Sequence, residues 1–402
     1  MNTLEQLALS QPLTDVYTAM ETDLMIAIAE QLAANDGEIN ATSEWRLKKL
    51  AESGKLSRET ARIIASYTGM QSDLLTETIE NAAVGIVNRL EPALQAVATE
   101  GFISVQDSTP ISSSVKNVIT HFHGQAKTDL NLVNTVMQYK ATQAYRDIVN
   151  KVYTESEANR NKRLSALGKY TLEVATGAES RTAAITKCIQ EFARDGIPAF
   201  IDKAGREWSP EAYISMDIRT TVSNTANKAQ EAVCGKYGVD LVQFTSHAGA
   251  RPGCEPYQGR IYSRSGRYGM AYDGDGNQFP YAPLSTTSYG EPAGILGINC
   301  GHSWYPFIEG VSFRRYYPYN KEESEKKYKE FQTQRYLERR VRKTKRELEM
   351  LQLQKDVDKE TIDRVKDVLK KQKAAYVKYS ADHNLREHND RLQVARMKEK
   401  VS

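Results

Sequence analysis

At 402 residues the chain is longer than a usual single domain, which predicts two or three folding units. Hydrophobic residues make up 40% and charged residues 26%, a balance typical of a protein that builds packed cores. No apolar run is long enough to cross a bilayer, and the N-terminal residues lack the pattern of a secretory signal. Four cysteines are too few for a disulfide framework in a chain of this length, so we expect a reducing cytoplasm.

Residues 1–105 predict an N-terminal helical domain. An apolar stripe from Val16 to Leu32 indicates a first helix, which we expect to break at residues 35–37. Three shorter helices follow in the prediction. The first begins near Thr42 or Ser43 and ends at Gly54, and the second runs from about Ser57 to Gly69. The third begins near Ser72 and is interrupted or kinked at Pro92.

Residues 106–195 predict a helical connector, and residues 196–319 a small central α/β module. Within the module, Ser209 and Pro210 suit the cap and first position of a helix that continues to about Gly235. Alternating, β-branched or aromatic runs predict three short strands. These strands are expected at residues 239–245, 260–263 and 304–307.

Residues 320–402 predict a basic, coiled-coil-like helical arm. Apolar positions three and four apart indicate two antiparallel helices separated by a polar break at residues 355–358. Leu348 is expected in the seam between them, and Ser380 is expected to cap a final helix. The predicted fold class is therefore α+β, mainly α.

Two turn-rich segments, residues 247–262 and 297–310, contain the chain's one local cluster of metal-ligand side chains. His247, Cys254, Cys300 and His302 are of the types that bind tetrahedral zinc, although their spacing is unusual for a zinc module. The alternative is two facing loops with buried cysteines and no cofactor, and a Cys254–Cys300 disulfide is a third interpretation. We expect the two segments to lie together, with turns at the glycines; the candidate motif residues are His247, Gly249, Arg251, Pro252, Cys254, Gly259, Asn299, Cys300, Gly301 and His302.

Motifs of known catalytic chemistry are not found in the sequence. A zinc deaminase needs a His- or Cys-x-Glu and a Pro-Cys-x-x-Cys pattern, and neither segment supplies them. Phosphate loops, dinucleotide fingerprints and the His-Glu-x-x-His motif are also missing. The acidic run at Asp273, Asp275 and Asn277 lacks the ligand of a calcium loop at its twelfth position and predicts a hairpin turn.

Positive charge is concentrated at the C-terminal end of the chain. Residues 321–402 contain 24 Lys and Arg against 16 Asp and Glu, whereas the preceding residues contain 30 against 35. A solvated helix face, contact with nucleic-acid phosphates and docking on an acidic protein all remain open for the densest run. The candidate contact residues are Arg339, Arg340, Arg342, Lys343, Lys345 and Arg346.

Several motifs give the chain a family resemblance. They are Ser246-His-x-Gly-Ala-Arg-Pro-x-Cys-x-x-Tyr-Gln-Gly259, Gly297-Ile-Asn-Cys-Gly-His302 with its trailing Pro306-Phe, Gln334-Arg-Tyr-Leu-Glu-Arg339, and the early Trp45-Arg-Leu-Lys-Lys-Leu50. With these motifs the chain resembles bacteriophage minor capsid proteins of the phage minor capsid protein 2 family, related to the Mu F-like head morphogenesis proteins. Residues 196–319 would then be the Mu F-like module.

The resemblance implies a structural protein of the virion head, made in the host bacterial cytoplasm and present in few copies. It implies association with the portal region or the head interior and a role in head assembly, DNA packaging or ejection. The implied partners are the portal protein, the major capsid protein, or both, with packaged double-stranded DNA as a further partner of the basic arm. No catalytic role is implied for the motif residues.

Two other functions are compatible with the sequence. The first is a metal-dependent or ADP-ribosylating enzyme housed in residues 195–315, which a bound metal and a polar, convergent pocket would favour. Buried Cys and His side chains in a flat module would favour the structural protein instead. The second is a generic DNA-binding protein that uses its basic arm.

Overall fold

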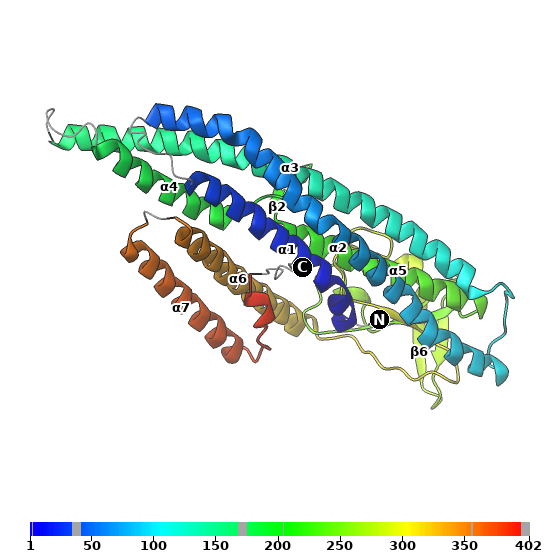
Figure 1. The fold of residues 1–402 in the computed structure, drawn as a ribbon. Helices are drawn as coiled ribbons and strands as arrows, with labels where there is room; N and C mark the ends of the chain where they lie inside the picture. The colour runs from blue at the N-terminus through cyan, green and yellow to red at the C-terminus, as the bar shows by residue number, and fades with distance from the viewer. Residues whose placement is uncertain (2, 34–41, 168–174, 204, 355–356, 395–402) are drawn as a thin grey trace. The chain divides into compact units, whose positions relative to one another are not determined.

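The computed structural model describes residues 1, 3–33, 42–167, 175–203, 205–354 and 357–394 (Figure 1). Within these residues the chain is mainly helical, with a small mixed sheet, and this confirms the predicted fold class. None of the described helices is both long and apolar enough to cross a membrane. The α-helices are α1 (Thr3–Ala33), α2 (Thr42–Thr99), α3 (Ile111–Leu167), α4 (Ala175–Asp195), α5 (Pro210–Lys236), α6 (Lys321–Gln352) and α7 (Lys359–Asp382).

The chain divides into two compact units that are interleaved along the sequence. The first consists of residues 1–14, 71–130 and 214–332, and the second of residues 15–70, 131–213 and 333–402. Helices α1, α2, α3, α5 and α6 therefore contribute residues to both units. The division into four consecutive segments expected from the sequence, residues 1–105, 106–195, 196–319 and 320–402, remains a prediction.

Helix α2 corrects the prediction of three short helices. It runs without a break through Gly54, Gly69 and Pro92. A glycine inside a helix costs only about 1 kcal/mol and a proline about 3 kcal/mol relative to alanine, so tertiary packing can outweigh both. Buried residues continue along the whole helix, from Leu56 to Leu94, and supply that packing. The predicted break at residues 35–37 lies outside the described residues.

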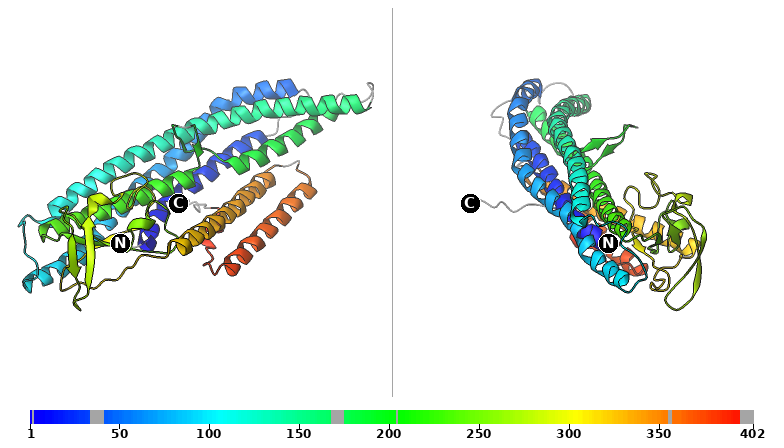
Figure 2. Two further views of the ribbon diagram at one scale, coloured as in Figure 1. Left: turned by 180° about the vertical axis from the view of Figure 1, so that it is seen from behind. Right: turned by 90° about the vertical axis from the view of Figure 1, so that its right-hand side faces the viewer.

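The main sheet, drawn in yellow-green in Figure 2, lies in the first unit. Its strand order is β5-β6-β4-β3-β7. Strand β3 pairs antiparallel with β4 and with β7, while β4 and β6 pair in parallel. The three predicted strands are confirmed as β3, β4 and β7, whereas β5 and β6 were not predicted. The strands are β3 (Leu241–Phe244), β4 (Ile261–Ser263), β5 (Gly269–Tyr272), β6 (Gln278–Pro283) and β7 (Trp304–Pro306).

The predicted hairpin turn is confirmed between β5 and β6. One carboxylate oxygen of Asp273 accepts hydrogen bonds from the backbone N–H groups of Asp275 (3.0 Å) and Asn277 (2.9 Å). These bonds satisfy the backbone of the turn, as short acidic side chains commonly do. A separate two-stranded sheet, β1 (Phe200–Ile201) with β2 (Glu207–Trp208), belongs to the second unit.

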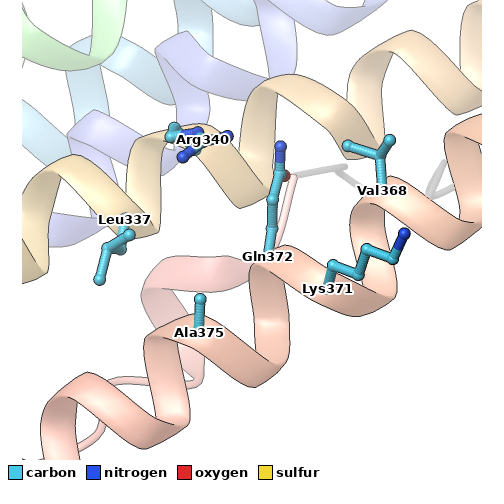
Figure 3. A pocket seen from close by; sticks show the side chains of 6 residues that line it. All are labelled: Leu337, Arg340, Val368, Lys371, Gln372 and Ala375. Atoms are coloured by element: carbon cyan, nitrogen blue, oxygen red, sulfur yellow. The ribbon is translucent and has the colours of Figure 1, made fainter.

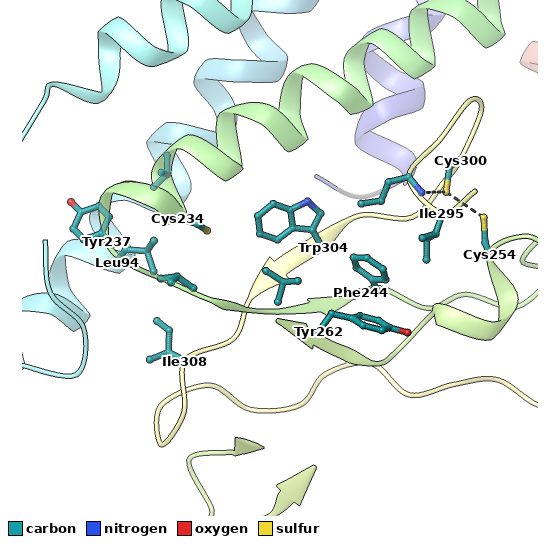
Figure 4. Close-up of a cluster of buried hydrophobic side chains, with 14 residues drawn as sticks. Leu94, Cys234, Tyr237, Phe244, Cys254, Tyr262, Ile295, Cys300, Trp304 and Ile308 are labelled. Atoms are coloured by element: carbon teal, nitrogen blue, oxygen red, sulfur yellow. Dashed lines mark hydrogen bonds between the residues drawn. The ribbon is translucent and has the colours of Figure 1, made fainter. Parts of the chain in front are cut away.

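Helix α5 and the main sheet enclose the apolar core of the first unit. Ser209 caps α5 through a hydrogen bond from Ala212 N to its Oγ at 3.3 Å, and Pro210 is the first residue of the helix, as predicted. The C-terminal end of α5 places Val233 and Cys234 against Phe244 and Trp304 of the sheet. Figure 4 shows that this apolar cluster ends at two cysteines, Cys254 and Cys300.

The paired helices α6 and α7 of the second unit confirm the prediction for the arm. They run antiparallel (Figure 1), and Val341, Tyr376 and Leu392 are buried between them and the following segment. Asp358 caps α7 by accepting a hydrogen bond from Thr361 N at 2.6 Å, which explains why the second helix begins after the polar break.

Two details of the predicted arm are wrong. Leu348 is only half buried. The fully buried positions near it are Met350 and Leu351. Ser380 does not cap a final helix: α7 continues to Asp382, and the buried Ser380 hydroxyl accepts a hydrogen bond from Gln334 Nε2 at 3.0 Å. Beyond α7, the described residues contain a short 3-10 turn at Asp390–Leu392 in place of the expected helix.

Candidate functional site

The two motif segments meet in the first unit, as predicted. Strands β3 and β7 pair antiparallel, with Val242 opposite Pro306, and this pairing aligns the loops that follow β3 and precede β7. At the meeting point Cys254 Sγ and Cys300 Sγ are 3.6 Å apart. The cysteines are therefore close without being bonded to each other.

The turn glycines are confirmed at two of three positions. Gly249 and Gly259 have φ values of +75° and +70°, and a Cβ added at Gly259 would lie 2.4 Å from the backbone carbon of Tyr317. Gly301 lies outside the turns of this loop, so the turn expected there is not found. In this loop the non-glycine residues with a positive φ are Leu296 (φ 62°) and Asn299 (φ 56°). Both precede Cys300 in the sequence.

Asn299 can adopt this conformation because its polar groups are held by α5. Its side-chain oxygen accepts a hydrogen bond from Arg219 Nη1 at 2.8 Å, and its backbone N–H donates to Thr220 Oγ1 at 2.9 Å. Asparagine is also one of the residues that tolerates a positive φ best. The helix thus fixes the loop just before the Cys300 sulfur.

Arg251 joins the two loops. Its guanidinium donates to the carbonyl oxygens of Ile298 and Gly294, both at 2.8 Å, and its Nε donates to Cys254 Sγ at 3.3 Å. Pro252 lies in the turn between Arg251 and Cys254. The arginine planar fork fits this task, because it can bind several acceptors at once in a fixed geometry.

The cysteine sulfurs receive several hydrogen bonds from N–H groups. Leu296 N and His302 N lie 3.2 and 3.4 Å from Cys300 Sγ. A hydrogen bond from the Cys300 thiol lowers the pKa of Cys254 below the usual thiol value, and so does the Arg251 guanidinium, although burial opposes the shift. The pKa of Cys300 is raised, first by the Cys254 sulfur and then by burial. The pair therefore favours one thiolate, at Cys254.

A chain of hydrogen bonds fixes the orientation of His302. The backbone N–H of His247 donates to Gln258 Oε1 at 3.0 Å, so that atom must be the acceptor oxygen of the amide. His302 Nε2 lies 3.2 Å from the same oxygen and must therefore carry the proton. The other ring nitrogen, Nδ1, faces Cys300 Sγ, which is 3.4 Å away.

His247 stacks on His302, with ring centroids 4.2 Å apart. Burial, followed by the nearby His302, lowers the pKa of His247 to about 4, so its ring is neutral near pH 7. Gln258, which is fully buried and connects the two histidines, was not predicted as a site residue. It lies within the recognised motif, but no side-chain type or spacing distinguished it.

Cys254, Cys300 and His302 form a group of potential ligands whose donor atoms all lie within 4.8 Å of one another. The three residues have exposed fractions of 0%, 4% and 1%, so a substrate could not reach them without a rearrangement. The arrangement therefore suits cross-linking of loops, through hydrogen bonds or a shared ligand, better than catalysis.

The predicted contact residues of α6 fall into two groups. Arg339, Arg340 and Lys343 are exposed. The other three side chains are held inside the second unit: Arg342 pairs with Glu211 at 2.6 Å, Arg346 pairs with Glu21 at 2.9 Å, and Lys345 donates to Gln393 Oε1 at 2.9 Å. The partners of these three side chains are distant in sequence. The basic run alone therefore could not show which of its side chains are exposed and which are held.

A cavity of about 250 Å³ lies between α6 and α7. Figure 3 shows that both helices contribute a basic side chain to its lining, Arg340 from α6 and Lys371 from α7. The remaining lining residues are apolar or uncharged: Leu337, Val368, Gln372 and Ala375. The groove therefore combines an apolar floor with positive charge.

The molecule is a mainly helical scaffold with a buried, hydrogen-bonded loop site. Residues 3–379 match the phage minor capsid protein 2 family, and the chain belongs to that family, as its motifs predicted. It is 30% identical over 305 residues to a structural protein of Lactococcus phage LL-H, covering 75% of this chain and 76% of the relative. It is 46% identical over 65 residues to a structural protein of Lactococcus phage mv4, covering 16% of this chain and 53% of the relative. No solved structure matches the chain.

Proposed function

We propose that this capsid-family protein is a minor component of the phage head, attached at the portal region or inside the head, and that it acts in head assembly, DNA packaging or ejection. The observation that carries the proposal is the family match over residues 3–379. Portal protein, major capsid protein, or both are its proposed protein partners. We also propose that the protein is made in the cytoplasm of the bacterial host.

The proposal assigns no enzymatic activity to residues 195–315. A catalytic nucleophile or metal must contact its substrate. The three Cys and His side chains of the cluster are at most 4% exposed, and Cys300 Sγ is already surrounded by N–H donors. Burial of this kind favours a structural site over a metal-dependent or ADP-ribosylating enzyme.

The exposed basic residues of α6 and α7 form what we call the arm basic surface: Arg339, Arg340, Lys343, Lys370, Lys371, Lys373 and Lys378. No acidic residue occurs between Asp367 and Asp382, so Lys373 has no acidic neighbour within one turn of α7. Burial and then the charges of Lys373 and Arg342 lower the pKa of Lys345, which indicates that positive charges of the two helices are close.

We propose that the arm basic surface contacts the phosphates of packaged double-stranded DNA. Closely spaced Lys and Arg on a helix pair, without base-reading chemistry beside them, suit sequence-independent binding to a polyanion. Binding should displace counterions from DNA, so the affinity should fall steeply as salt rises.

The test is the triple variant Arg339→Ala, Arg340→Ala, Lys343→Ala, measured with duplex DNA over a range of salt concentrations. Loss of up to three phosphate contacts should flatten the log–log salt dependence by about 2.7 units. The matched control is Lys55→Ala, Arg58→Ala, Lys127→Ala, which removes three exposed charges from α2 and α3 and should leave the slope unchanged.

Incorporation into heads distinguishes DNA from a protein partner. If the arm docks on an acidic surface of the portal protein, the triple variant should be lost from purified heads while its DNA affinity and salt slope match those of the wild type. That result would contradict the DNA proposal and support the portal as the partner of the arm.

A further inference from the structure

The three donor atoms of the loop site lie within 4.8 Å of one another, and two of their separations are those of a tetrahedral metal site. With metal–sulfur distances of about 2.3 Å and metal–nitrogen distances of about 2.0 Å, tetrahedral angles place two sulfurs about 3.8 Å apart and a sulfur and a nitrogen about 3.5 Å apart. The observed distances are 3.6 Å between the Cys254 and Cys300 sulfurs and 3.4 Å between Cys300 Sγ and His302 Nδ1.

The histidine is prepared for a metal by its other nitrogen. In metal sites, the ring nitrogen that does not bind the ion usually donates a hydrogen bond that fixes the tautomer. Here Gln258 Oε1 accepts from both His247 N and His302 Nε2, so His302 Nδ1 presents its lone pair toward the cysteine sulfurs. This polarity follows from a backbone N–H and does not depend on a chosen amide orientation.

The surroundings also support sulfur in its ionised form. Two backbone N–H groups, from Leu296 and His302, point at Cys300 Sγ, and the Arg251 guanidinium lies against Cys254 Sγ. Metal ions bind cysteine as thiolate and release its proton to solvent. The donors would stabilise the negative charge that two thiolates bring into a buried site.

A second histidine lies beside the triad. His247 Nδ1 lies 3.2 Å from the carbonyl oxygen of Ala248 and can donate its proton there. His247 Nε2 is buried and makes no hydrogen bond, although a buried polar atom normally has a partner. Its ring is stacked on that of His302, so His247 packs against the triad without being one of its donors.

We propose that Cys254, Cys300 and His302 bind one Zn²⁺ ion that fastens the loop after β3 to the loop before β7. Thiolates and an imidazole are donors that zinc prefers. The three side chains are at most 4% exposed, so a substrate does not reach the ion and its role is structural.

The first test measures zinc in the full-length protein. After metal-free purification and addition of Zn²⁺, gel-filtered protein should retain about one equivalent, and Co²⁺ in its place should give a thiolate-to-cobalt absorption band. Cys300→Ser and Cys254→Ser should abolish both signals. Cys234→Ser, a buried cysteine of the same apolar core that lies outside the donor group, should keep both.

Two further measurements separate metal binding from a general folding defect. His302→Cys supplies a new thiolate at the same place and should still bind about one equivalent of zinc. In the wild-type protein, a chelator should make Cys254 and Cys300 reactive to alkylation while Cys188 and Cys234 stay protected. Wild-type protein that holds no zinc, retention of zinc by Cys300→Ser, or a Cys254–Cys300 disulfide in the purified protein would each overturn the proposal.

Discussion

Among single residues, Glu21 and Arg346 form the most deeply buried ion pair described in the second unit. Their side chains are 2% and 13% exposed, and Arg346 Nη1 lies 2.9 Å from a carboxylate oxygen of Glu21. The other carboxylate oxygen accepts a hydrogen bond from Ile197 N at 3.1 Å. Burial raises the pKa of Glu21, and the Arg346 charge acts against that shift.

Replacing Arg346 with Met should lower the free energy of unfolding by about 3–5 kcal/mol at neutral pH, because it leaves a buried carboxylate without its cation. Loss of the cation raises the folded-state pKa of Glu21 further above its unfolded value. The free energy of unfolding of the variant therefore falls as the pH rises through the folded-state pKa. The difference between the variant and the wild type should shrink toward acidic pH. Urea unfolding at pH 7.5 and pH 5 measures the difference.

The control for this prediction is the double variant Glu21→Gln, Arg346→Met. The Gln side chain can still accept the hydrogen bond from Ile197 N but carries no charge, so most of the lost stability should return at neutral pH. A defect of equal size at both pH values would contradict the ion-pair explanation.

Gly259 is the second single-residue position with a sharp expectation. Replacement by Ala should destabilise the protein by roughly 3 kcal/mol or more, because an added Cβ meets the backbone of Tyr317 and Pro318 in addition to the positive φ. Gly266→Ala is the matched control: its φ is +85°, but nothing lies within 4 Å of an added Cβ.

We expect the control to lose only about 1 kcal/mol, which is the cost of the left-handed conformation. Thermal or urea unfolding of both variants separates the steric contribution from the conformational one. Equal losses for the two variants would show that the close approach of residues 317–318 to Gly259 has no effect on stability.

At the scale of elements, the apolar pattern predicted helices and strands better than it predicted their ends. Gly54, Gly69 and Pro92 are helix-stopping signals by local propensity, but buried side chains on both sides of each position keep α2 continuous. Strand β6 was missed because it contains Pro280 and alternates weakly, and its pairing with β4 is a long-range contact that no local pattern reveals.

The seam between α6 and α7 gives a prediction at this scale. Val341→Asp should destabilise the arm by several kcal/mol, because Val341 is completely buried and an unpaired carboxylate would replace it. Leu348→Asp should cost less, since Leu348 is only half buried. Loss of α6–α7 helicity on heating, followed by circular dichroism, measures both effects.

Val377→Asp is the control for the seam, because this valine of α7 is 45% exposed. Its unfolding should change little from that of the wild type. If Val341→Asp unfolds like Val377→Asp, the two helices are not held together by an apolar seam.

At the scale of the whole molecule, the sequence predicted which side chains form the loop site but not what connects them. His247, Cys254, Cys300 and His302 were identifiable because ligand-type residues are rare in this chain and cluster in two segments. Gln258 gained its significance only from the direction of its hydrogen bonds. Counting charges likewise identified the basic arm. It could not show that Arg346 and Arg342 of the arm form ion pairs with Glu21 and Glu211.

We propose that the protein is a minor component of the head, at the portal region or in the interior. Cryo-electron microscopy of purified virions, compared with particles that lack this protein, tests that claim most directly. We predict difference density at the single portal vertex or within the head, together with a copy number far below that of the major capsid protein. Density repeated at every capsomer of the shell, or identical particles with and without the protein, would contradict it.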